Sequence, residues 1–265
     1  MAQYKEKERK RPRRPQMDEQ EETMLVEGRN AVTELLRAGR ACDKVFLANG
    51  AHTGDIAAMA RERGIPVVLC DRRKLDGMST TGNHQGIIAQ AAAHEYASLD
   101  DLFAAAEQAG EPPLFIICDG IADPHNLGAI IRSADTAGAH GVIIPKRRAA
   151  GLTAVAARAS AGAIEHIGVH KAVNLPSLID TLKERGVWIF GAEADGTVDL
   201  YEADFARATA IVIGSEGEGI SRLVREKCDF IVSIPMRGKV NSLNASNAAA
   251  VLLFEAVRRR TCGGK

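Results

Sequence analysis

The chain has 265 residues, 46% hydrophobic and 26% charged, which is typical of a globular protein with one large or two ordinary domains. No run approaches the roughly 18 apolar residues of a membrane span, and the N-terminus lacks a secretory apolar segment, so we expect a cytoplasmic protein without membrane contact. Lys and Arg total 34 and Asp and Glu total 34, so net charge alone does not favour nucleic-acid binding.

Residues 1–23 contain few apolar side chains and pass from a basic to an acidic block, which predicts a disordered charged arm. From residue 24 the pattern becomes globular. Helices are predicted over residues 29–39 and 55–63, and strands over 44–48, 67–70 and the apolar run 87–93. Together these elements predict a compact α/β unit over residues 24–95.

Residues 96–113 are predicted to be a linker, because their periodicity is weak apart from a short helix after Ser98 and they end in the breaker Gly110-Glu111-Pro112-Pro113. Strands are then predicted over 114–118, 142–144, 164–169, 187–192, 210–213 and 230–234, and helices over 126–137, 153–158, 175–185, 219–228 and 245–260. This alternation over residues 114–265 predicts a mainly parallel sheet covered on both faces, with ligands at the carboxyl ends of its strands.

The first of three unusual strand-to-helix loops covers residues 119–128. Asn126 in this loop is a suitable N-cap for the following helix, which is the ordinary structural role of such a residue. Arg132, about two turns into that helix, interrupts a small and apolar run. It therefore either faces solvent or offers a planar cation to a phosphate.

The second loop, residues 213–220, has three glycines in six positions after an apolar strand, so its backbone can approach a ligand closely. It lacks the dinucleotide fingerprint GxGxxG, because Arg222 stands where a glycine is needed. The Glu216 carboxylate would repel a pyrophosphate but suits a cationic ligand or a hydroxyl donor. From these residues alone, a ligand site and an ordinary loop are equally open.

The third loop, residues 234–247, places five uncharged hydrogen-bonding side chains within seven residues, before a long apolar helix. One helix cap, by Asn244 or Ser246, does not require so many. The remaining amides and hydroxyls could read a base edge, hold a ribose or position a nucleophilic hydroxyl.

Hydrolytic and metal chemistry find no support in the sequence. It has no GxSxG or HExxH motif and no cysteine beside a histidine, and the spacing of Glu165, His166 and His170 falls on a predicted strand. The five cysteines are odd in number and contain no CxxC pair, which predicts reduced thiols. Positive charge gathers in the arm and in the triplets Arg72-Arg73-Lys74, Lys146-Arg147-Arg148 and Arg258-Arg259-Arg260. One such triplet is usually a solvated face, but together they favour a polyanionic partner.

The three loops, in this order, resemble the signature motifs of the SpoU (TrmH-type) family of SPOUT RNA 2′-O-methyltransferases. The resemblance covers residues 24–260 and is greatest to the RlmB-type ribosomal RNA guanosine 2′-O-methyltransferases. Residues 24–95, with VEGRNAV at 26–32 and His84-Gln85-Gly86, resemble the L30e-like substrate-binding domain, and residues 114–265 resemble the SPOUT methyltransferase domain. The resemblance implies a C-terminal trefoil knot that forms the S-adenosyl-L-methionine pocket, and a homodimer.

The resemblance also implies roles for individual residues. The catalytic set is Asn126, Arg132, Glu216, Ser242 and Asn244, and the cofactor-binding set is Gly191, Ala192, Glu193, Gly214, Ile234, Pro235, Leu243 and Ser246, with no metal. Asn247 departs from the pattern, which is apolar there. A 2′-hydroxyl target requires RNA rather than DNA, with ribosomal RNA favoured over transfer RNA. Candidates for RNA contact are Arg29, Arg72, Arg73, Lys74, His84, Lys146, Arg147 and Arg148.

Because an arginine keeps its proton in proteins, we expect Arg132 to bind the adjacent phosphate and stabilise the developing alkoxide rather than to act as a base. Asn126, Glu216 and Ser242 would orient the hydroxyl or the arginine. Two other function classes remain: an RNA-binding protein that kept this fold without turnover, and a nucleotide-dependent oxidoreductase on a Rossmann sheet. The intact catalytic set argues against the first, and the failed GxGxxG against the second.

Overall fold

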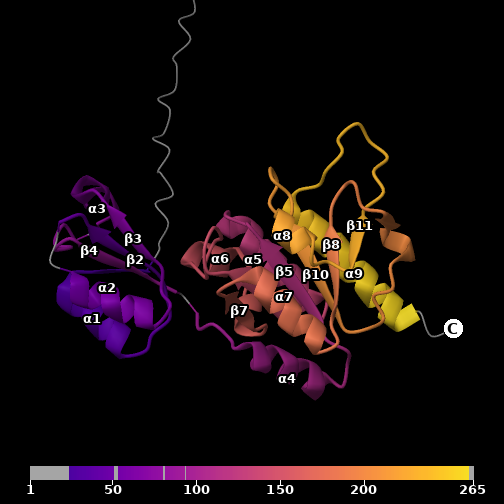
Figure 1. The fold of residues 1–265 in the computed structure, drawn as a ribbon, viewed down its shortest axis with the longest axis horizontal. Helices are drawn as coiled ribbons and strands as arrows, with labels where there is room; N and C mark the ends of the chain where they lie inside the picture. Colours follow the sequence, from indigo (N-terminus) through magenta and orange to yellow (C-terminus); the bar gives the residue numbers. More distant parts are fainter. Residues whose placement is uncertain (1–23, 51–52, 80, 93, 263–265) are drawn as a thin grey trace, which may run out of the picture.

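The computed structural model describes residues 24–50, 53–79, 81–92 and 94–262, so the predicted arm and residue 93 lie outside the described residues. Two α/β parts lie side by side and are joined near residue 96 (Figure 1). We call them the N-terminal part and the larger part. In the described residues no helix is long and apolar enough to cross a membrane.

The N-terminal part is a four-stranded sheet in the order β1-β4-β2-β3, with helices on both faces. One face packs on α1 and α2 through residues such as Leu35 and Ile56, and the other packs on α3 through Leu75. Its elements are β1 (Met24–Glu27), α1 (Arg29–Arg37), β2 (Cys42–Ala48), α2 (Gly54–Glu62), β3 (Val67–Cys70), α3 (Arg72–Met78) and β4 (Ile87–Ala91).

Two elements of the N-terminal part were not predicted. β1 has only four residues, too few for a periodic signal, and forms by antiparallel pairing with β4. α3 buries only Leu75, so its sequence has almost no apolar stripe. The basic triplet Arg72-Arg73-Lys74 is therefore the exposed first turn of a helix.

The larger part contains a seven-stranded sheet in the order β7-β6-β5-β10-β8-β11-β9, and every pairing in it is parallel. The predicted α/β fold class is confirmed. Its strands are β5 (Leu114–Asp119), β6 (Gly141–Pro145), β7 (Val169–Ala172), β8 (Trp188–Ala192), β9 (Val198–Asp199), β10 (Thr209–Gly214) and β11 (Phe230–Ser233).

Each face of this sheet has its own core. Side chains alternate along β5, so that Ile116 and Cys118 join one cluster while Phe115 and Ile117 join the other. The first cluster is covered by α5 (Pro124–Thr136), α6 (Ala154–Ala159) and α9 (Ala245–Cys262), and the second by α4 (Leu99–Ala109), α7 (Leu175–Glu184) and α8 (Arg222–Arg225). The interval 96–113 thus holds a helix that packs on the larger sheet through Leu102, capped by Ser98.

Two predicted elements of the larger part are wrong in position or length. The expected strand over 164–169 is instead a 3-10 turn, Ala163–Glu165, followed by β7, whose His170 donates from Nδ1 to the Ala97 carbonyl. The expected helix over 219–228 shrinks to α8, because Gly219, Ile220 and Ser221 commit their backbone N–H groups to the preceding loops. β9 and the 3-10 turn Leu200–Glu202 were not predicted.

The triplet Arg258-Arg259-Arg260 is structural rather than a phosphate site. Arg258 and Arg259 pair with the buried Glu255 at 2.6 and 3.1 Å, and the hydrogen bond from Arg258 is the main reason that the pKa of Glu255 is lowered. The Arg260 guanidinium donates to four backbone carbonyls, those of Pro112, Pro113, Phe205 and Arg207. It therefore ties the end of α9 to two distant segments.

Replacing Arg260 with alanine is expected to lower the free energy of unfolding by about 2–4 kcal/mol, since at least two half-buried carbonyls lose their donor. Chemical denaturation measures this effect. Arg259→Ala is the matched control, because Glu255 keeps Arg258, and it should cost less than about 1 kcal/mol. Equal losses in the two variants would contradict the role given to Arg260.

Candidate active site

The second and third loops, together with the end of β8, enclose one cavity of about 390 Å³ at the carboxyl ends of β8, β10 and β11. It is lined by Ala192, Glu193, Ala194, Asp195, Ile213, Gly214, Ser215, Glu216, Gly219, Val232, Ile234, Met236, Asn241, Ser242, Leu243, Ala245 and Ala248. The last two belong to α9, so the C-terminal helix forms part of the wall.

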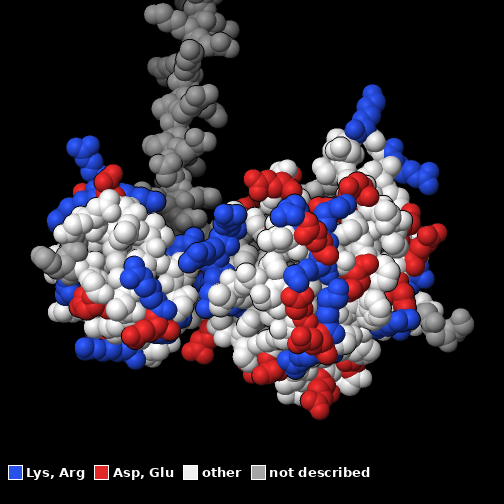
Figure 2. Space-filling view, viewed as in Figure 1, with Lys and Arg blue, Asp and Glu red and all other residues white. Residues whose placement is uncertain are grey.

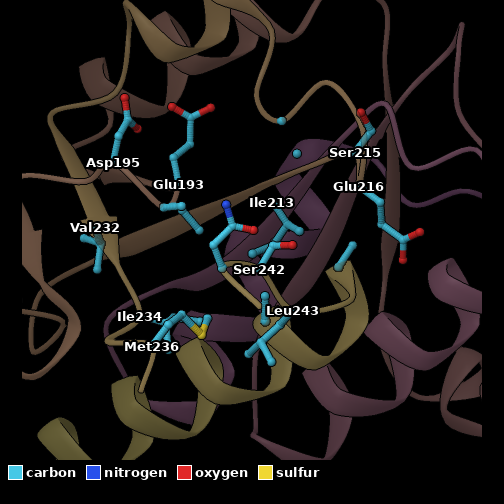
Figure 3. Close-up of a pocket in the computed structure, with 17 residues that line it drawn as sticks. Glu193, Asp195, Ile213, Ser215, Glu216, Val232, Ile234, Met236, Ser242 and Leu243 are labelled. Carbon is cyan, nitrogen blue, oxygen red and sulfur yellow. The ribbon is translucent and has the colours of Figure 1, made fainter. Parts of the chain in front are cut away.

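The cavity wall combines apolar surface with negative charge. Glu193 and Asp195 lie together on one side in Figure 3 and Glu216 lies on the other, with Ile234, Met236 and Leu243 forming apolar surface. No lysine, arginine or histidine is among the lining residues. Such a wall suits a ligand that carries positive charge and an apolar or aromatic group.

Gly214 is required by the way the second loop folds. The loop closes through two backbone hydrogen bonds between Ser215 and Gly219, of 3.1 and 2.9 Å. A Cβ on Gly214 would lie 2.1 Å from the carbonyl carbon of Gly219 and 2.3 Å from the nitrogen of Ile220. Only glycine lets the backbone come this close, so Gly214 sets the shape of the cavity.

Glu193 anchors the same loop from the end of β8. Its Oε1 accepts from the backbone N–H of Ile220 at 3.1 Å, and its Oε2 accepts from Arg225. Arg225 also pairs with Asp195 at 3.1 Å. The hydrogen bond to Glu193 is the main reason that the pKa of Arg225 lies above its ordinary value. The two carboxylates are thus held in place at the cavity edge.

A hydrogen-bonded cluster of Asn126, Glu216 and Asn244 joins all three loops. The amide nitrogen of Asn126 donates to Glu216 Oε1 at 3.1 Å, and that of Asn244 donates to the same oxygen and to Asn126 Oδ1 at 3.0 Å. Glu216 Oε2 has no partner among the described residues. The cluster therefore presents a free carboxylate oxygen at the rim of the cavity.

The helix caps explain why these amides are available. Asp123 caps α5, with Pro124 in its first turn, so the predicted capping role of Asn126 is wrong and its side chain is free to reach Glu216. Asn244 caps α9: its Oδ1 accepts from the backbone N–H of Ser246 at 2.9 Å while its amide nitrogen joins the cluster. One residue thus serves both the fold and the site.

The predicted site residues are only partly brought together. Ser242 lies in the cavity wall, as do five of the predicted cofactor residues: Ala192, Glu193, Gly214, Ile234 and Leu243. Arg132 is exposed on α5, and its guanidinium makes no hydrogen bond or ion pair with the cluster or with any other described residue.

Three predicted cofactor residues do not line the cavity. The open side of Gly191 faces Cys228 and Ile220 in the core below. Pro235 is exposed outside the wall, and the Ser246 hydroxyl donates to Asn244 Oδ1 at 2.6 Å. Conversely, the sequence analysis did not select Asp195 or Met236, and it assigned no role to Asn241, although Asn241 is one of the polar side chains counted in the third loop.

The residues predicted to contact RNA differ in whether their side chains are accessible. His84 is buried, accepting from the Gly86 N–H at Nδ1 and bonding to Asp76 at Nε2, so the expectation that its side chain contacts RNA is corrected to a role in loop structure. Arg29 pairs with Asp55 at 3.0 Å. Four of the predicted contacts are exposed and have no hydrogen-bond partner in the described chain: Arg72, Arg73, Arg147 and Arg148. Lys74 lies over the Phe46 ring, and Lys146 is half-buried.

Within the described residues no group of three His, Cys, Asp or Glu could hold a metal.

Comparison with known proteins gives consistent matches over both parts. Residues 113–254 match the SpoU rRNA Methylase family, and residues 25–97 match the RNA 2′-O ribose methyltransferase substrate binding family. The chain is 49% identical over 243 residues to a Bacillus subtilis protein described as the TrmH family tRNA/rRNA methyltransferase YacO, covering 91% of this chain and 97% of that relative.

Solved structures agree with these sequence matches. The SpoU methyltransferase AviRb from Streptomyces viridochromogenes, in complex with the cofactor AdoMet, is 27% identical with a TM-score of 0.59, covering 90% of this chain and 91% of that one. An AdoMet-bound rRNA methyltransferase from Sinorhizobium meliloti is 26% identical with a TM-score of 0.56, covering 89% and 86%. Both likenesses extend over the two parts of the chain.

Proposed function

Because this chain belongs to the SpoU (TrmH-type) family of RNA methyltransferases, we propose that it methylates a ribose 2′-hydroxyl in RNA, with a guanosine of large-subunit ribosomal RNA as the first candidate. The enzyme uses S-adenosyl-L-methionine and acts in the cytoplasm, where such RNA is found. The observation that carries the proposal is the Asn126–Glu216–Asn244 cluster, which stands at the rim of an acidic cavity.

The cavity fits this cofactor. S-adenosylmethionine carries a sulfonium and an ammonium group, for which Glu216 offers a carboxylate with no cationic partner in the described chain, whereas Glu193 and Asp195 already pair with Arg225. The backbone of Gly214 and the side chains of Ile234 and Leu243 would hold its adenosine portion. When bound, the cofactor supplies an electrophilic methyl group.

The protein's part is to orient the ribose hydroxyl and to disperse the charge that develops on its oxygen. The free Oε2 of Glu216 would accept a hydrogen bond from that hydroxyl, while Asn126 and Asn244 hold the carboxylate still. Ser242 stands in the same wall. Arg132 has no partner in the described chain, and we assign its guanidinium to the phosphate next to the target ribose.

Incubating the protein with labelled S-adenosylmethionine and unmodified ribosomal and transfer RNA tests the proposal. We expect label in ribosomal RNA at one ribose, located by its resistance to alkaline cleavage. Label in transfer RNA alone would change the substrate but keep the reaction. Label on a base, or in neither RNA, would contradict the proposed function.

A homodimer through α9 is part of the proposal. Val251 and Phe254 lie one turn apart on this helix, 38% and 51% exposed although both are apolar. They make an unpartnered apolar stripe on the helix that also lines the cavity. A second copy of the chain would cover this stripe and bring its own α9 beside the site.

Replacing Phe254 with glutamate should weaken dimerisation by about tenfold or more, because a buried phenyl ring contributes roughly 1.5–3 kcal/mol. Sedimentation over a concentration series measures the change. Leu69→Glu, at an apolar residue of β3 that is 65% exposed, is the matched control and should leave the assembly unchanged. A monomeric wild-type protein with full activity would contradict the dimer.

The loop Lys146-Arg147-Arg148 is proposed to contact the RNA backbone. Changing Arg147 and Arg148 together to glutamine should reduce the slope of log affinity against log salt by roughly 1.4, if each contacts one phosphate of a single strand. Cofactor affinity should not change. The same double change at Arg207 and Arg222, whose ion pairs lie on the surface, is the control; a slope that falls equally there would show a general charge effect.

A further inference from the structure

Asp43 is a buried acidic residue of the N-terminal part, and its side chain contacts the larger part. It lies in β2, where the pairing with β4 shifts between Cys42 and Lys44, and it is among the few buried charged residues of the described chain. Its Oδ1 pairs with Lys171 of the larger part at 2.6 Å and also accepts from the Tyr96 hydroxyl. The N-terminal part thus places a carboxylate into the larger part.

The contact is tight as well as charged. The side chains of Asp43 and Lys171 are 3% and 11% exposed. A Cβ on Gly151 would lie 2.3 Å from Asp43 Oδ2, so the carboxylate rests directly against the backbone of the larger part. Within the described chain, Asp43 Oδ2 is a buried oxygen without a hydrogen-bond partner.

A buried ion pair of this kind contributes more to fixing the relative orientation of the two parts than to the free energy of unfolding. Desolvation offsets much of the attraction in a buried ion pair, and an unpartnered oxygen adds a further cost. A hydrophobic contact would join the two parts at lower cost but in many orientations. Asp43 Oδ1, by contrast, has both of its partners only when Lys171 and Tyr96 are in place.

Tyr96 extends the contact to a third segment. Its hydroxyl accepts from the backbone N–H of Leu152 at 3.0 Å, and its ring lies 4.4 Å below the Lys171 ammonium. Burial, and then the neighbouring Asp43, raise the pKa of the Tyr96 phenol far above its ordinary value, so it stays a donor. β2, the joining segment and the loop before α6 therefore meet at one point.

This contact aligns basic groups from the two parts. Beside it lies a cavity of about 370 Å³, to which the N-terminal part contributes Arg63 and the larger part contributes Lys146 and His170. Figure 2 shows Lys and Arg side chains gathering where the two parts meet. Arg63 is itself fixed by the carbonyls of Leu36, Gly39 and Arg40. Relative rotation of the two parts would separate these groups.

We propose that Asp43 is a positioning residue for RNA methylation, which holds the N-terminal part at one orientation to the methyl-transfer cavity. The inference rests on the proposed function, since the orientation matters only if RNA contacts both parts. It predicts that loss of the contact impairs RNA binding while the cofactor cavity, which lies in the larger part alone, keeps its affinity.

Two variants break the contact from opposite sides. Asp43→Asn removes the charge, and Gly151→Ala adds a methyl group against the carboxylate without changing any hydrogen-bonding group. The second keeps the test valid if the first folds poorly. Asp180→Asn, in a surface pair with Lys227, and Gly77→Ala, with nothing within 4 Å, are the matched controls.

The first readout is the distance between spin labels on cysteines introduced at Glu62 and Glu184, both exposed, in a Cys262→Ser background. Labelled chain is diluted with unlabelled chain, so that a dimer carries one labelled protomer. We expect a narrow distribution in the wild type and controls and a broad one in both variants. A narrow, unchanged distribution in the variants would overturn the proposal.

The second readout separates positioning from general damage. If the competent orientation falls to about one tenth of the population, the KM for RNA should rise about tenfold, with kcat and cofactor affinity within about twofold. A fall in kcat with unchanged KM would overturn the proposal. Absence of RNA methylation in the wild type would refute the proposed function, and the label distances would still decide whether Asp43 sets the orientation.

Discussion

Replacing Arg132 with lysine is expected to lower the turnover of RNA methylation by about 100-fold or more, although the positive charge is kept. Lysine lacks the planar fork that binds a phosphate through two parallel hydrogen bonds, and loss of one such group typically costs 10²–10³ in kcat. Arg132 is exposed and its side chain makes no hydrogen bond or ion pair within the described residues, so the fold should not change. Single-turnover assays with saturating RNA and cofactor measure the effect.

Arg222→Lys is the control for this prediction, because Arg222 is an exposed arginine of the larger part whose ion pair is with Glu226 on the surface. It should retain full turnover. Cofactor affinity and assembly should be the same in both variants. Near-normal turnover of the Arg132→Lys protein would rule out the role given to the guanidinium.

Replacing Gly214 with alanine is expected to weaken cofactor binding by about 10- to 100-fold. The added Cβ would lie within 2.1–2.4 Å of backbone atoms of Gly219 and Ile220, and relieving such a clash costs roughly 1–3 kcal/mol. The loop would have to move into or away from the cavity that it lines. Isothermal titration with S-adenosylmethionine measures the loss.

The same loop provides the control. Gly217 has nothing within 4 Å of its would-be Cβ and does not line the cavity. Gly217→Ala should therefore bind the cofactor normally. If both alanines weaken binding equally, flexibility of the loop rather than the close approach at Gly214 explains the requirement for glycine.

The sequence was most informative where local chemistry and tertiary structure agree. Strongly apolar strands such as β5 and β10 and well-bounded helices such as α7 were predicted within a few residues. β1, β9 and α3 were not, because they are short and form through pairing or packing with distant segments. The expected strand over 164–169 failed for a related reason: its residues are apolar enough, but only the later ones pair with β6.

The candidate site shows the same division. The three loops could be selected from their composition, and family resemblance supplied the cluster that the structure brings together. Asn126 was interpreted locally as a helix cap, and the real cap, Asp123, frees it for Glu216. Asp195 could not be selected, because its place at the cavity depends on how β8 and β11 lie beside each other.

The place of α9 in chain order has a consequence for synthesis of the protein. This helix follows every other described element, yet Ala245 and Ala248 belong to the cavity wall and its apolar side fills the core beneath the sheet. The N-terminal part has its own core and can fold as soon as it leaves the ribosome. The methyl-transfer cavity cannot form until α9 has emerged, so a nascent chain can complete its N-terminal part well before it can bind the cofactor.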